Sequence, residues 1–235
     1  TITAARRAAQ SIPDTRQVST IIHRAKEFVT GVFSGVIPYY CPGCGRPGKS
    51  LVCPDCERKI LYIEEPYCHS CGRPLPPGVT YTHSCRRCES DSYHYDLCRS
   101  ALLYDPPIDG VVKKFKFHGN MHMGYYLCRL MRGRIAEEAG AFADFRQLDA
   151  LVPVPLHPFR FVRRGFNQSA LIAREAGAEL GVPVENLLSR IRNTQPQSRL
   201  NAEQRIENVR GAFAVKKKYD PRGGSYAVVD DVMTS

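Results

Sequence analysis

The stretch CPGCGRPGKSLVCPDC, residues 41–56, contains two pairs of cysteines, and two residues separate the members of each pair. In such a pair both sulfur atoms turn towards one point, and two pairs complete the tetrahedron of thiolates that Zn²⁺ prefers. The glycine that follows the first pair suits a tight turn, because such turns often need a positive φ angle. The stretch therefore predicts a small fold organised around a structural zinc ion.

The same spacing occurs twice more, at 68–71 and 85–88, so four pairs lie within residues 41–88. The eight predicted zinc ligands are Cys41, Cys44, Cys53, Cys56, Cys68, Cys71, Cys85 and Cys88. We favour sequential grouping, first pair with second and third with fourth, over a cross-braced arrangement, and both stay open. A closed site of four sulfurs has no free coordination position, so we expect two structural zinc ions and no hydrolysis at either.

Other interpretations of the cysteines are weaker. A disulfide framework or a redox dithiol would need an export signal or a different context, whereas repeated CxxC spacing without such a signal favours metal. His69 and His83 could replace a thiolate, but eight thiolates already suffice, so we expect loop positions. Cys98 and Cys128 lie outside the pattern and are expected in the apolar core.

Composition limits the class of protein. The chain has 235 residues and a formal charge of +10, which falls to about +6 if eight thiolates bind two zinc ions. A basic excess favours polyanionic partners such as nucleic acid or phosphorylated small molecules. No stretch approaches the roughly 18 apolar residues of a membrane span. We expect a soluble protein of the cytoplasm.

The chain begins at Thr1 and stops inside an apparent motif, so we expect it to be incomplete. The first residues lack the apolar core of a secretory signal; a disordered leader is favoured over a transit peptide. We expect a leader and helix at 1–38, a double zinc ribbon at 39–92 and an α/β domain at 93–235.

The α/β domain is predicted from alternating apolar runs and amphipathic stretches. We expect strands at 97–104, 149–153, 186–191 and 226–230. A short helix that runs into a loop is predicted within 108–119, and longer helices are predicted at 122–139 and 168–181, with a further short helix that Asn201 and Gln204 cap. Such alternation predicts a mostly parallel sheet that is covered by helices, and ligands of such sheets lie beyond the carboxyl ends of the strands.

Three segments follow those carboxyl ends: PVPLHPFRFVRRGFNQS, RNTQPQSRLNAEQR and DDVMTS. The first two are rich in arginine, whose planar guanidinium suits phosphate oxygens. The third begins with Asp230 and Asp231, and paired carboxylates accept hydrogen bonds from vicinal hydroxyls or hold Mg²⁺. The segments together predict a site for a phosphorylated, hydroxyl-rich ligand.

VVDDVMTS resembles the start of the phosphoribosyl pyrophosphate signature of type I phosphoribosyltransferases. With PVPLHP, RRGFNQS, QSRLNAEQRIENVRGAF and the cysteine pairs, the chain resembles the ComF family of competence proteins over about residues 35 to 235. The resemblance implies a double zinc ribbon followed by a type I phosphoribosyltransferase-like parallel sheet with helices on both faces. It also implies binding of phosphoribosyl pyrophosphate with Mg²⁺.

The resemblance assigns roles to particular residues. Asp230 and Asp231 would hold the ribose hydroxyls, and Thr234 and Ser235 would begin the phosphate loop. The remaining implied positions are Arg163 and Arg164 near pyrophosphate, Arg199 on a flexible loop over the ligand, and Arg205 and Asn208 as braces of that loop. The signature normally continues beyond Ser235, so we expect the 235-residue chain to bind this ligand weakly.

Three functions stay open. The first is a phosphoribosyl-pyrophosphate-binding protein that supports uptake of single-stranded DNA in natural transformation, with DNA and DNA-uptake proteins as partners. The second is an active phosphoribosyltransferase of nucleotide salvage, and the third is a zinc-ribbon DNA-binding protein with a degenerate transferase domain. VKKFKFHG, residues 112–119, has a composition suited to single strands, but a helix with Phe115 buried and its lysines in water is the favoured explanation.

Overall fold

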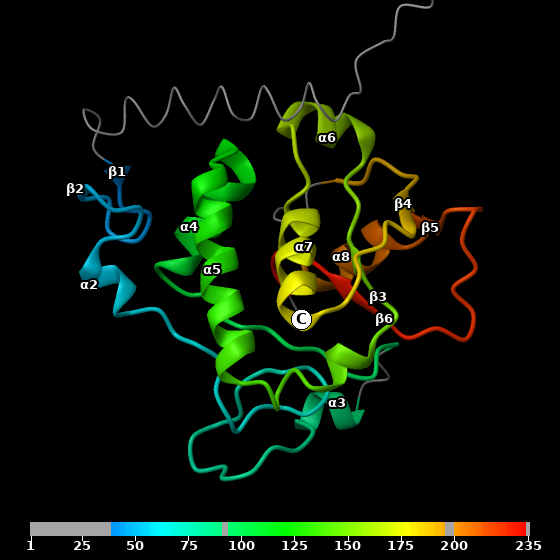
Figure 1. Cartoon of the computed structure of the whole chain (residues 1–235), viewed down its shortest axis with the longest axis horizontal. Coiled ribbons are helices and arrows are strands. Elements are labelled where there is room, and N and C mark those ends of the chain that lie inside the picture. Colours follow the sequence, from blue (N-terminus) through cyan, green and yellow to red (C-terminus); the bar gives the residue numbers. More distant parts are fainter. Residues whose placement is uncertain (1–38, 91–93, 196–199, 234–235) are drawn as a thin grey trace, which may run out of the picture.

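The computed structural model describes residues 39–90, 94–195 and 200–233 (Figure 1). Short elements dominate the cysteine-rich part, and longer helices follow. In chain order the elements are β1 (Tyr39–Tyr40), β2 (Pro47–Gly48), α2 (Pro54–Glu57), α3 (Arg86–Ser90), α4 (Ile108–His118), α5 (Met121–Glu137), the 3₁₀ helix η1 (Asp144–Gln147), β3 (Ala150–Pro153), α6 (Pro158–Arg164), α7 (Gln168–Leu180), β4 (Leu188–Arg190), α8 (Ala202–Val209), β5 (Phe213–Val215) and β6 (Tyr226–Val229). A mixed helix and strand fold that follows a cysteine-rich region is confirmed.

The central sheet pairs two strands that lie far apart in the sequence. β3 runs parallel to β6, with Leu151 opposite Ala227, and Leu151 also forms a parallel bridge to Val184. Helix α7 packs on both β3 and β6. The strands expected at 149–153 and 226–230 are therefore confirmed as a parallel pair.

Two strand predictions need correction. Residues 97–104 form no regular strand; Leu102 makes a single antiparallel bridge to Tyr62, so this segment pairs with the cysteine-rich region instead of the central sheet. The strand expected at 186–191 is β4, but it pairs antiparallel with β5. The sequence did not lead us to expect β5, a three-residue strand whose existence depends on this partner.

The four helices predicted after residue 93 lie close to their expected positions, whereas α6 lies in a segment that we expected to be a loop. α4 ends at Gly119, which adopts a positive φ of 63°. The cap predicted for α8 is present, because Asn201 accepts from the amide of Gln204 and the Gln204 side chain accepts from the amide of Asn201. None of the helices within the described ranges has the length and apolar character needed to cross a bilayer.

The main hydrophobic core joins the two halves of the chain. It contains Cys41 and Cys56 of the cysteine-rich region together with Val111 and Phe115 of α4 and Leu127 of α5. A second cluster around Leu151 lies between α7, the end of α5 and the parallel sheet. Cys128 is buried as expected, whereas Cys98 is only half-buried. The first core therefore makes the cysteine-rich region part of the same folded unit as α4 and α5.

We predict that Gly124→Ala destabilises the protein by about 1–3 kcal/mol. A Cβ atom at residue 124 of α5 would overlap the edge of the fully buried Phe115 ring, with the ring Cζ at 2.8 Å. Gly133→Ala on the same helix is the control, since a Cβ there meets nothing within 4 Å. It should leave stability unchanged or raise it by up to about 1 kcal/mol. Urea unfolding measures both, and equal stability of the two variants would contradict the packing.

Candidate functional site

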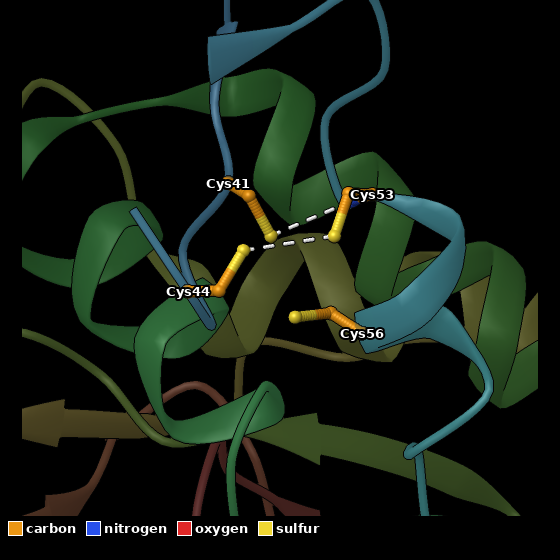
Figure 2. A group of neighbouring side chains, drawn as sticks. All are labelled: Cys41, Cys44, Cys53 and Cys56. Carbon is orange, nitrogen blue, oxygen red and sulfur yellow. Dashed lines mark hydrogen bonds between the residues drawn. The ribbon is translucent and has the colours of Figure 1, made fainter. Parts of the chain in front are cut away.

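The first four cysteines converge on one point (Figure 2). The Sγ atoms of Cys41, Cys44, Cys53 and Cys56 all lie within 4.8 Å of one another, and those of Cys44 and Cys53 are 3.7 Å apart. A tetrahedral zinc ion with bonds of about 2.3 Å needs sulfur atoms about 3.8 Å apart. The tetrad therefore fits Zn²⁺ in both the number and the spacing of its ligands.

Neighbouring groups favour thiolates in this tetrad. The amide of Cys53 donates to Cys41 Sγ at 3.4 Å, and Arg46 Nε donates to Cys44 Sγ at 3.4 Å. The hydrogen bond from Arg46 lowers the pKa of Cys44 to about 6. Burial instead raises the pKa of Cys56 to about 12. A cation at the centre would favour the deprotonated form of all four sulfurs, because the thiolate is the metal ligand.

The other four cysteines form a second tetrad. The Sγ atoms of Cys68, Cys71, Cys85 and Cys88 also lie within 4.8 Å of one another. Burial raises the pKa of Cys68, but the amides of Cys71 and Cys85 outweigh it, and the pKa falls to about 6. The grouping is sequential in both tetrads, which is the arrangement that we favoured.

The turns that build the tetrads repeat each other. The amide of Cys41 donates to the carbonyl of Arg46, and the amide of Cys68 donates to that of Arg73. The glycines that follow these pairs, Gly45 and Gly72, have positive φ angles of 73° and 68°, as the sequence predicts. His83 Nδ1 lies 3.2 Å from the carbonyl of Tyr81 and is not part of a tetrad.

The two acids lie at the carboxyl edge of the parallel sheet. Asp230 and Asp231 follow β6, and the loop that leads to α6 follows β3, so both segments begin at the same edge. The amide of Val154 donates to the carbonyl of Val229 at 3.0 Å and continues the pairing to this edge. The backbone therefore brings the segment after β3 and the segment after β6 to the same edge, as we expected.

The surroundings of the two acids differ. Asp230 accepts a hydrogen bond from Ser169 Oγ at 2.7 Å and remains partly open to solvent. Burial by the surrounding atoms raises the pKa of Asp230, and the Asp231 carboxylate adds to this increase. Asp231 instead forms an ion pair with Lys116 of α4 at 2.9 Å, and its side chain is only 5% exposed. Asp230 is thus the accessible acid of the pair.

The two arginines predicted near pyrophosphate also differ. Arg164 is half-buried and donates to Gln168 Oε1 at 2.7 Å. Burial lowers the pKa of Arg164, and the charges of Asp231 and Asp230 oppose this effect, so its guanidinium lies near the acids. Arg163 is exposed on α6. The remaining predicted residues, Arg199, Thr234 and Ser235, lie outside the described residues.

Two side chains of α8 hold the backbone on both sides of residues 196–199. Asn208 of α8 exchanges two hydrogen bonds of 3.0 Å with the backbone of Gln195. Arg205 Nε donates to the carbonyl of Leu200 at 3.0 Å. Both side chains lie where braces of this loop were expected.

Some residues near this edge were not predicted from the sequence. Gln168 is 2% exposed and donates to the carbonyl of Lys116, so it links Arg164 to α4. Thr194 accepts from Arg160 at its carbonyl and from Arg190 at its hydroxyl. Polar residues in the sequence motif RRGFNQS were the available signal for Gln168, but no local pattern marks Thr194.

Two cavities lie away from the acids. One of about 430 Å³ lies between α5 and α7 beside Cys128 and Arg132. Another of about 440 Å³ lies beside Phe166 and Asn167. Neither is lined by Asp230 or Asp231.

We predict two zinc ions per chain, one in each tetrad. Cys44→Ser should reduce the content to about one, because a hydroxyl is a poor replacement for a thiolate and the other tetrad stays intact. Cys44 is exposed, so the change leaves the core alone. Cys98→Ser is the control and should keep two. Elemental analysis of protein purified under reducing conditions measures both; less than one zinc in the unmodified protein would contradict the assignment.

Comparison with known proteins places the chain in a family. Residues 32–89 match the family model described as "Double zinc ribbon domain". "Competence protein F" of Haemophilus influenzae is 30% identical over 199 residues, which cover 83% of this chain and 84% of that protein. "DNA utilization protein YhgH" of Escherichia coli is 28% identical over 85% of this chain and 86% of that protein.

"Competence protein ComFC" of Bacillus subtilis is 26% identical over 78% of this chain and 72% of that protein. No solved structure matches the chain. The chain belongs to the ComF family of competence proteins.

Proposed function

We propose that this protein supports the uptake and use of single-stranded DNA, and that it binds phosphoribosyl pyrophosphate at the carboxyl edge of its parallel sheet. One observation carries the second part: the segment that contains Arg164 and the segment that contains Asp230 and Asp231 begin at the same sheet edge, and the charge of Arg164 interacts with both acids. Carboxylates suit the ribose hydroxyls and a guanidinium suits the pyrophosphate oxygens. The names of the relatives, which refer to competence and DNA utilization, support the first part.

The acids would take different roles towards this ligand. Asp230 is accessible, and we assign it the first contact with the ribose hydroxyls. Asp231 is paired with Lys116, so it contributes fully only after the ligand or Mg²⁺ displaces that amine. Asp230 and Asp231 are the residues that would hold Mg²⁺, which would neutralise charge on the phosphates. We keep Arg199, Thr234 and Ser235 as further proposed ligand contacts, and we keep Arg163 as a phosphate contact that this ligand and a nucleic-acid strand would share.

The tetrads serve the fold in this proposal. Each offers four sulfurs to one ion and leaves no position for water or substrate. The first tetrad shares a core with α4, the helix that carries Lys116 to the acids. We therefore assign zinc a structural role, and through α4 this role includes holding Lys116 at the ligand edge.

One observation favours a second candidate, a zinc-ribbon DNA-binding protein whose transferase-like half no longer binds this ligand. Asp231, one of the two acids that the ligand needs, is already occupied by its ion pair with Lys116. In that case affinity for single-stranded DNA falls with salt and survives charge removal at Asp230 and Asp231.

We predict that Asp230→Asn weakens binding of phosphoribosyl pyrophosphate in the presence of Mg²⁺ by roughly ten- to a hundredfold, because a charged acceptor becomes neutral at constant size. Asp220→Asn is the control; that acid is exposed, pairs with Arg222 and precedes β6 at the other end of the strand. Calorimetric titration of the full-length protein measures both. No heat of binding with the unmodified protein would refute the proposed ligand and leave the second candidate.

We predict no base-dependent release of pyrophosphate when the protein, Mg²⁺ and phosphoribosyl pyrophosphate are incubated with a panel of purine and pyrimidine bases. The described edge supplies groups for the sugar and phosphate, and a binding role needs no acceptor base. A coupled pyrophosphate assay provides the measurement. Release that depends on one base would instead establish an active phosphoribosyltransferase.

A further inference from the structure

Helix α6 presents large apolar side chains to solvent. Phe159 is 74% exposed, Phe161 is 49% exposed and Val162 is 82% exposed. Single exposed apolar residues are ordinary, but three lie within this seven-residue helix, and Phe159 and Val162 are one turn apart on the same side. Groups of exposed apolar side chains mark binding surfaces. The Phe159 ring stacks on the ring of His157 with centroids 5.3 Å apart, so it is oriented by a neighbour and still open to a partner.

Arginines lie beside these rings. Arg163 is exposed on the same helix, and α6 contains no acidic residue. Arg160 donates to the carbonyl of Thr194 and so holds α6 against the turn that follows β4. In that turn Arg192 is exposed and donates to the carbonyl of Arg210 at 2.5 Å. Helix α6 lies at one end of the molecule (Figure 1), and the Arg160–Thr194 hydrogen bond joins it to the turn that carries Arg192.

We propose that this surface binds single-stranded nucleic acid through stacking on Phe159 and Phe161 and through phosphate contacts to Arg163 and Arg192. These four residues define the α6 face. Every base has a π surface that stacks on an aromatic ring, and an arginine next to the ring pairs with the backbone. Bases inside a duplex are already stacked on each other, so exposed rings favour a single strand. The inference rests on the proposed role in DNA use and names the surface that serves it.

Charge complementarity favours this occupant. Residues 186–219, which include β4 and β5, carry eight basic and two acidic side chains. A polyanion gains from such a concentration of charge, and release of its counterions makes the gain depend on salt. An apolar protein segment would use the rings but not the arginines.

The segment 112–119 is a weaker candidate for the same role. Phe115 is fully buried, as expected for a core position. Lys113 pairs with Asp109 and Lys116 pairs with Asp231. Phe117 is 61% exposed and is the aromatic residue of this segment that a strand could reach.

Fluorescence anisotropy with a labelled oligothymidylate tests the proposal on the full-length protein. The double variant Phe159→Ala, Phe161→Ala should bind about tenfold more weakly or worse, and its dependence on salt should not change, because stacking involves no counterions. Arg163→Ala should reduce the slope of log affinity against log salt by about 0.7, the value for one phosphate contact to a single strand. A loss of folding would change affinity and salt slope together, whereas the proposal predicts lower affinity at an unchanged salt slope for the double variant.

Matched controls use residues of the same type elsewhere. Phe117→Ala removes an exposed ring from α4, and Arg58→Ala removes an exposed arginine beside the first tetrad. Both should leave affinity and salt slope unchanged. Melting temperatures of all variants report whether the fold is kept.

Several results would overturn the inference. The first is weaker DNA binding by Phe117→Ala together with normal binding by the α6 variants. The second is the absence of oligonucleotide binding at low salt. The third is a double variant that melts at a lower temperature but binds DNA with unchanged affinity. The last result would mean that another part of the protein covers the rings. Titration with phosphoribosyl pyrophosphate separates the two proposals: binding of that ligand without DNA binding refutes the α6 face alone, and the reverse refutes the proposed ligand alone.

Discussion

Gly43 in the first cysteine turn and Gly110 in α4 both lie where a side chain has no room. A Cβ atom at residue 43 would lie 2.6 Å from that of Pro107, and one at residue 110 would lie 2.9 Å from the carbonyl carbon of Pro42. This close contact places the first tetrad in the core that also holds α5. Because α4 extends from this contact to Lys116 at the acids, the zinc site, the core and the ligand edge depend on one interface.

The acid pair shows how two adjacent residues acquire different chemistry. Asp231 lies against the amine of Lys116, which compensates its charge in a buried position. Burial and the like-charged Asp231 disfavour the charged form of Asp230, although the Ser169 hydroxyl donates a hydrogen bond to it. A cation or a group with hydroxyl donors that arrives at this edge would relieve Asp230 first. A ligand would therefore contact Asp230 first, whereas Asp231 would become available only when its ion pair with Lys116 opens.

The features that depend on residues close in sequence were predicted from local sequence patterns. Cysteine spacing predicted the tetrads, and the Asn201 cap predicted the start of α8, because each depends on residues close in sequence. The strands β3 and β6 were predicted from their short apolar runs, and their parallel direction from the alternation of strands and helices. The Lys116–Asp231 ion pair joins residues 115 positions apart, and no periodicity carries that information. The strand expected at 97–104 failed for the same reason, since its partner was decided by packing against Tyr62.

Charge separates the roles of the two halves. Residues 39–92 carry seven basic and six acidic side chains. A zinc ion bound by four thiolates has a net charge of about −2, so two such centres make this segment negative by about three charges. Residues 186–219 keep their eight basic side chains against two acidic ones. A polyanion would therefore be repelled by the metal-bound region and attracted to the region around β4. This charge distribution agrees with the proposal that the tetrads stabilise the fold while the arginine-rich half would bind the nucleic acid.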